Sequence, residues 1–78
     1  MRILIENEET SEYLTETHHW SKNPLKGKQF PNRRLAFRAA KLEPIGTFNI
    51  VCHIPKTKEF INLDHGQGIG KSATEAGT

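Results

Sequence analysis

The amino-acid sequence predicts an α+β domain in which an antiparallel sheet of four to five short strands carries one helix packed on one face. Three observations favour this class: short β-branched or alternating segments separated by polar turns, one central segment with helical periodicity, and a length of 78 residues with 35% hydrophobic content, enough for a single modest core. We expect this single domain to cover residues 1–63 and a flexible glycine-rich tail to follow over residues 64–78.

The first third of the chain predicts a hairpin and a third short strand. Residues 2–6 are apolar and β-branched, residues 7–11 are polar and typical of a turn, and residues 12–15 supply the returning strand. A further strand is expected around residues 18–21. Residues 22–28 contain Pro24, Gly27 and three lysines, which indicates a loop.

The only convincing helix follows, with Asn32 as its predicted N-cap and Pro44 ending it after Leu42 or Glu43. At about 100° per residue, an apolar arc and a cationic arc separate on the helical wheel. The apolar arc, expected to face the sheet, contains Leu35, Ala36, Ala39, Ala40 and Leu42; the outer arc contains Arg33, Arg34, Phe37, Arg38 and Lys41.

The second half of the chain predicts a final hairpin. Residues 47–54 alternate, which places Phe48, Ile50, Cys52 and Ile54 inward and Thr47, Asn49, Val51 and His53 outward. After a turn at residues 55–57, residues 58–63 return with Ile61 and Leu63 inward and Phe60 pointing away. We expect the helix to dock on Phe48, Ile50, Ile54 and Ile61. Cys52, the single cysteine, forms no internal disulfide and is expected to be a packed thiol.

Charge is segregated along the chain although the net charge is only +2. Residues 1–16 contain five glutamates and one arginine, whereas residues 17–42 contain seven basic residues and no acidic residue. A basic block of this kind indicates an anionic partner such as nucleic acid. Whether the acidic hairpin neutralises the basic helix is left open by the sequence.

Phe37 lies at the centre of the cationic arc, three or four residues from Arg33, Arg34 and Lys41. An aromatic ring among cations suits stacking on unpaired bases and equally suits a protein interface; alternatively, Phe37 folds over a sheet edge or covers Trp20. Trp20 either extends the patch or anchors the core. The predicted partner-binding residues are Arg33, Arg34, Phe37, Arg38 and Lys41 of the helix, Lys22, Lys26 and Lys28 of the loop, and Trp20.

No motif predicts catalysis, a cofactor or a metal. The glycine-rich residues 66–72 lack phosphate-loop spacing, because His65 stands where the first glycine is needed. The four histidines lack zinc-ligand spacing, and an outward His53 meeting Asp64 or His65 across the last hairpin is the weaker alternative. Without a catalytic motif, we expect a non-enzymatic protein. No apolar run is long enough to span a bilayer and no signal peptide is evident, so we expect it to be cytoplasmic.

The order Tyr13-Leu14-Thr15, Trp20-Ser21-Lys22, then Phe30-Pro31-Asn32 leading into Ala36 and Ala40, resembles a layout common among small phage and prophage accessory proteins. The resemblance covers about residues 12–41 and transfers no catalytic or binding residue. It implies a context, because phage accessory proteins of this size often inhibit a host defence or regulatory complex, anti-CRISPR proteins among them.

Two binding functions follow from these predictions. The first is docking through the basic and aromatic helix face onto a host protein complex that handles nucleic acid, and the alternative is direct DNA or RNA binding by the same patch. An enzyme acting through Cys52 or His53 is least favoured. So small a core leaves sheet edges to be covered, which either a homodimer or a larger partner would do.

Overall fold

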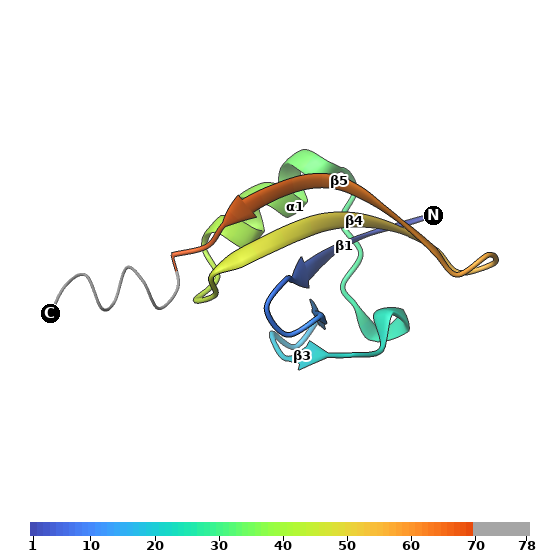
Figure 1. The fold of residues 1–78 in the computed structure, drawn as a ribbon, viewed down its shortest axis with the longest axis horizontal. Helices are drawn as coiled ribbons and strands as arrows, with labels where there is room; N and C mark the ends of the chain where they lie inside the picture. Colours follow the sequence, from blue (N-terminus) through green and yellow to red (C-terminus); the bar gives the residue numbers. More distant parts are fainter. Residues whose placement is uncertain (70–78) are drawn as a thin grey trace, which may run out of the picture.

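The computed structural model describes residues 1–69, which form one five-stranded antiparallel sheet and one α-helix. The elements are β1 (Arg2–Asn7), β2 (Glu12–Leu14), β3 (Trp20–Ser21), a 3₁₀ turn η1 (Pro24–Lys26), α1 (Arg33–Lys41), β4 (Thr47–Ile54) and β5 (Glu59–Gln67). The strand order is β3-β2-β1-β4-β5 (Figure 1). The predicted α+β class is confirmed.

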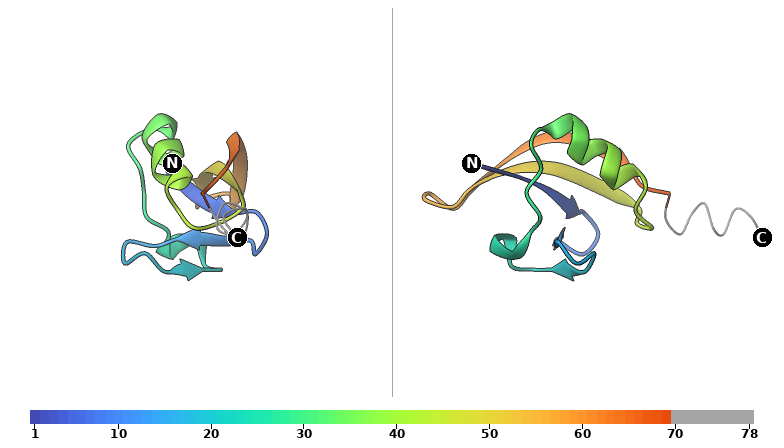
Figure 2. Two further views of the ribbon diagram at one scale, coloured as in Figure 1. Left: turned by 90° about the vertical axis from the view of Figure 1, so that its left-hand side faces the viewer. Right: turned by 180° about the vertical axis from the view of Figure 1, so that it is seen from behind.

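The first hairpin is short and turns away from the rest of the sheet. β1 pairs with β2 only at its end, where Glu6 lies opposite Tyr13 and Asn7 opposite Glu12. Nearer its start, the Ile3 carbonyl accepts a hydrogen bond of 3.0 Å from the Phe30 N–H. The segment between η1 and α1 therefore runs beside β1, and β2, β3 and η1 lie together on the side of the molecule opposite α1 (Figures 1 and 2).

Helix α1 begins where the sequence predicts, because the Asn32 side chain accepts a hydrogen bond of 2.9 Å from the Leu35 N–H. The helix ends at Lys41 with Leu42 as its C-cap. α1 packs on β5, β1 and β4 and covers one face of the sheet (Figure 2). Ala36 and Ala40, on the side of α1 that faces the sheet, are fully buried. Because their side chains are short, the helix can approach the strands closely.

The orientation of α1 differs from the predicted one by a rotation toward Phe37. This ring is partly buried and meets Phe48 edge-on, with 5.3 Å between ring centroids, whereas Leu35 and Leu42 are 42% and 73% exposed. The physical reason lies in β5: a Cβ added to Gly66 would come within 2.9 Å of the Phe37 ring, so the missing side chain makes room for it. The wheel alone could not reveal this space.

Strand β4 is buried on both faces, which corrects the predicted alternation. The helix-side core contains Ile5, Leu14, Ala36, Ala40, Ile45, Phe48 and Ile50, and a second cluster on the opposite face contains Leu4, Tyr13 and Val51. Asn49, Val51 and His53 were expected to face solvent but are buried. Val51 packs with Leu4 and Tyr13 and His53 stacks on Phe60, while Asn49 lies among polar side chains of β1 and β5. Cys52 is buried, as expected.

Strand β5 extends past Leu63, the last residue of the predicted strand, and ends at Gln67. Its pairing with β4 shifts register between Ile50 and Val51, and beyond the strand the Gly68 N–H donates to the Gly46 carbonyl at 2.8 Å. The ordered unit thus includes the first part of the predicted tail; residues 70–78 lie outside the described residues. Ile54 is half-buried and Ile61 is 49% exposed, so α1 docks on Phe48 and Ile50 but not on Ile61.

Candidate functional site

The solvent-facing side of α1 combines apolar and cationic side chains. Leu35, Arg38 and Leu42 stand at positions i, i+3 and i+7, which places them in one row along the helix. Arg34 and Lys41 stand beside that row. We call the six exposed residues the α1 face: Arg33, Arg34, Leu35, Arg38, Lys41 and Leu42.

The cations of the α1 face have no acidic partner within residues 1–69. The two ion pairs in that range join His18 to Glu43 at 3.5 Å and His65 to Glu8 at 3.8 Å. The acidic turn of the first hairpin lies elsewhere, with the Glu9 carboxylate against Gly46 in the loop before β4. Within residues 1–69, the glutamates of that hairpin thus form no ion pair with the helix.

The predicted basic patch divides into two parts. α1 lies at one side of the molecule and η1, which carries Lys26, at the other side in all three views (Figures 1 and 2). The Lys22 ammonium donates to the Thr10 carbonyl at 2.9 Å, and the Lys28 ammonium lies 5.2 Å from the centroid of the Phe30 ring. α1 therefore carries Arg33, Arg34, Arg38 and Lys41, whereas Lys22 lies at the β1–β2 turn and Lys26 in η1, away from the helix.

The two predicted aromatic contributors both pack inward. Phe37 contacts Phe48, and the Lys41 ammonium lies 5.9 Å from the Phe37 ring centroid. Trp20 on β3 is partly buried against the helix-side core. Both rings were predicted to bind a partner, and both are partly buried instead. Leu35 and Leu42 were predicted to face the sheet, and both are exposed instead.

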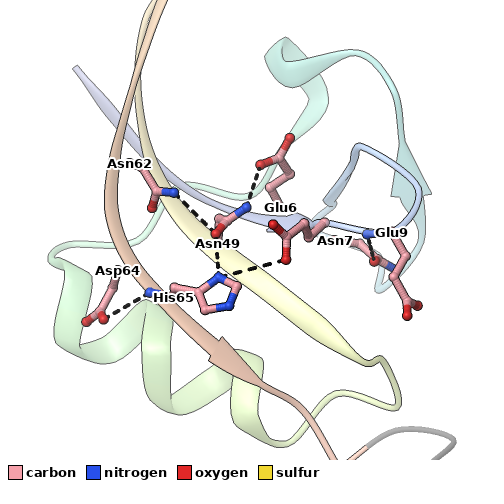
Figure 3. Close-up of polar contacts among 8 residues, drawn as sticks. Glu6, Asn7, Glu9, Asn49, Asn62, Asp64 and His65 are labelled. Atoms are coloured by element: carbon pink, nitrogen blue, oxygen red, sulfur yellow. Dashed lines mark hydrogen bonds and ion pairs between the residues drawn. The ribbon is translucent and has the colours of Figure 1, made fainter.

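A row of polar side chains crosses the opposite face of β1, β4 and β5 (Figure 3). Asn49 donates to Glu6 at 3.3 Å and accepts hydrogen bonds from Asn62 at 3.2 Å and from the His65 ring at 2.8 Å. The Glu8 carboxylate lies 3.8 Å from the same ring nitrogen of His65. This network satisfies the buried Asn49 amide and ties three strands together, so its role is structural. The alternation of residues 47–54 hid it, because the pattern assigned Asn49 to solvent.

The metal alternative is not formed. His53 lies opposite Phe60, whereas Asp64 and His65 lie opposite Ile50 and Asn49 further along β4. Within the described residues, no group of three or more histidine, cysteine, aspartate or glutamate side chains is placed to hold a metal ion. The buried thiol of Cys52 is enclosed in the sheet.

Comparisons of the chain with protein-family models, with curated proteins and with solved structures found no match. The resemblance to phage accessory proteins therefore stays a prediction. Across residues 1–69, neither α1 nor η1 is long and apolar enough to cross a membrane.

Proposed function

We propose that this protein is a non-enzymatic docking protein that binds an acidic surface of a partner protein through the α1 face. One observation carries the proposal: two exposed leucines and Arg38 form a row, flanked by Arg34 and Lys41, and none of these cations has an acidic partner in the described chain. Arginine is enriched in the energetically important part of protein interfaces, and the buried centre of an interface is more apolar than its rim. Acidic groups of a partner would complement the cations and accelerate association.

A protein partner is favoured over nucleic acid because of the aromatic rings and the leucines. Binding of unpaired bases relies on aromatic side chains that stack on them, and Phe37 is packed against Phe48 instead. Leu35 and Leu42 would gain little beside hydrated phosphates, but would be buried at a protein interface. Following the sequence-based expectation, we propose a partner that belongs to a complex handling nucleic acid, as for an inhibitor of the anti-CRISPR kind.

Direct binding of DNA or RNA is the second candidate, and the four cations of the α1 face favour it. Each phosphate contact contributes to the salt dependence of binding, so four contacts to duplex DNA predict a slope of log K against log salt of about −3 to −4. Replacing the leucines should hardly change this binding. The two candidates therefore differ in their response to charge and to apolar substitutions.

The test uses three double variants of the full chain. Leu35→Ser/Leu42→Ser removes the apolar row, Arg34→Glu/Arg38→Glu reverses two charges on the same face, and Lys26→Glu/Lys56→Glu makes the same charge change at exposed sites outside α1. Each variant is used for quantitative capture from a nuclease-treated lysate, and the captured protein is then purified for affinity measurements. Each is also titrated with single- and double-stranded oligonucleotides at low and physiological salt.

We expect a nuclease-resistant partner with an acidic surface, whose affinity falls at least about tenfold in the leucine variant and in the arginine variant. The Lys26→Glu/Lys56→Glu control should bind normally. Oligonucleotide binding that is lost in the arginine variant but retained in the leucine variant would favour the second candidate. Equal binding of one nuclease-resistant partner by all three variants would contradict docking through the α1 face.

A further inference from the structure

A pocket opens between η1 and the turn that joins β4 to β5. Its volume is about 330 Å³, which lies in the range of small-molecule sites, roughly 300–1,000 Å³. No residue of α1 lines it, so the pocket is separate from the α1 face. Its lining residues are Asn23, Pro24, Leu25, His53, Pro55, Lys58 and Phe60.

The walls of the pocket are mostly apolar and include a flat aromatic stack. The His53 ring lies parallel to the Phe60 ring with 4.6 Å between centroids and 17° between planes, and Tyr13 stacks on Phe60 at 5.8 Å. Pro24 and Pro55 add two further rings to the lining. Planar ligands pack well in such a site because aromatic rings prefer offset-stacked or edge-on contacts with other rings.

The η1 wall is held in place by Arg2. Its guanidinium donates to the carbonyls of Pro24, Leu25 and Gly27 at 2.6, 3.1 and 3.0 Å. These bonds use the directional donors of Arg2, while its positive charge stays close to the pocket. The wall opposite the aromatic stack is therefore preformed.

The polar groups offered by the pocket are donors. The Asn23 side-chain oxygen already accepts a hydrogen bond of 3.0 Å from the Leu25 N–H, which leaves its amide N–H₂ as the group available to a ligand. Lys58 contributes an ammonium that forms no ion pair within residues 1–69. No aspartate or glutamate lines the pocket. An anionic ligand thus meets complementary groups, and a cationic ligand does not.

His53 supplies a third donor. Its residue is 4% exposed and its Nδ1 is buried without a hydrogen-bond partner among the described residues. Burial, together with the charges of Arg2 and the N-terminal amine, lowers the pKa of His53, so the ring is neutral near neutral pH. A proton on Nδ1 would be an orphaned buried donor, which is rarer in proteins than an under-used acceptor. We therefore assign the proton to Nε2, which can donate to a ligand.

We propose that this pocket binds a small aromatic carboxylate, with the ring against the His53–Phe60 stack and the carboxylate on the donors of Asn23, His53 and Lys58. An imidazole at this position, unlike a hydrocarbon ring, places a hydrogen-bond donor in the wall of the pocket, and a bound carboxylate would accept from it. The proposal does not depend on the α1 face or on its partner.

The test is a titration of the full chain with three probes that share one ring and differ in charge: indole-3-acetate, tryptophol and tryptamine. Binding is followed by two-dimensional amide NMR and by calorimetry. We expect indole-3-acetate to bind at least about threefold more tightly than tryptophol, since an exposed ion pair is worth a factor of up to about five, and tryptamine to bind most weakly. The amide signals of Leu25, His53 and Phe60 should shift. Equal affinities for the acetate and the alcohol, or no shift at these residues, would overturn the proposal.

Variants identify the donors. Lys58→Asn removes the charge, and Asn tolerates the positive φ of 61° at this turn position. It should weaken indole-3-acetate about three- to fivefold and leave tryptophol unchanged. Lys56→Asn is the matched control in the same turn and should bind normally. His53→Phe keeps a ring in the wall and should weaken the acetate about tenfold because a charge-assisted donor is lost. Unchanged affinity in both Lys58→Asn and His53→Phe would contradict the assigned donors.

Discussion

Replacing Gly66 by alanine tests the central packing contact of the helix-side core. An added Cβ would lie 2.8 Å from Cζ of Phe48 and 2.9 Å from Cε2 and Cζ of Phe37, closer than van der Waals contact allows. Forcing extra volume into a packed core costs about 1–3 kcal/mol, and the smaller conformational freedom of unfolded alanine returns about 0.4–1 kcal/mol. We expect Gly66→Ala to lower the free energy of unfolding by about 1–2 kcal/mol.

Thermal and urea unfolding followed by circular dichroism measure this loss. For a domain of this size, each kcal/mol corresponds to about 4–8 °C in Tm, so the expected fall is roughly 4–16 °C. Gln67→Ala, an exposed neighbour on the same strand, is the matched control and should change Tm little. The double variant Gly66→Ala/Phe37→Leu should be less destabilised than the sum of its single variants by about 0.5 kcal/mol or more, because a smaller side chain relieves the contact.

Strict additivity of the two substitutions would show that Phe37 does not pack over Gly66. An unchanged Tm in Gly66→Ala would indicate that residues 64–69 do not pack against the core and belong to the flexible tail that the sequence predicts. Either result would refute the rotated placement of α1.

Three further substitutions test other parts of the structure. Asn32→Ala removes the side chain that accepts the Leu35 N–H and should cost about 1 kcal/mol in urea unfolding and lower the helical signal in circular dichroism. Arg2→Ala removes three hydrogen bonds to the η1 segment and should cost about 1.5–3 kcal/mol, with faster amide hydrogen exchange in residues 24–28 as the local readout. The lowered pKa of His53 means that the unfolded state binds the extra proton, so the free energy of unfolding should fall as pH drops below 6.5; His53→Phe should be more stable than the wild type and lose this slope in urea titrations between about pH 7.5 and pH 5.

Local signals in the sequence predict most of the element order. Asn32 caps α1 through its own side chain, and the alternating residues 47–54 form β4 with the predicted bounds. Residues 8–11 of the predicted turn connect β1 to β2, while Asn7 still belongs to β1. Each of these features depends on interactions within a few residues, which propensities and periodicity describe. The sheet and helix of the fold class follow from them.

The side chains whose positions were predicted wrongly depend on contacts between segments that are distant in the sequence. Phe37 turns inward because Gly66, on a strand nearly thirty positions away, has no side chain. Val51 is buried against Tyr13 of β2, and His53 is buried beside η1 and under the Phe60 ring of β5. A period-two pattern describes a strand with one covered face, so it cannot indicate a strand covered on both. The sequence accordingly predicted the cations of the α1 face but not its exposed leucines. It did not predict the pocket.

The position of β1 between β2 and β4 has a consequence for the order of folding. Its pairs with β4 run from Arg2 opposite His53 to Asn7 opposite Phe48, so they join residues far apart in the chain. Closing such loops slows folding relative to helical proteins of similar size. During synthesis β1 emerges long before β4, and β5, which carries Gly66, emerges later still. The core around Phe37 can therefore close only after Gly66 of β5 has left the ribosome, so the contact between α1 and the sheet forms late.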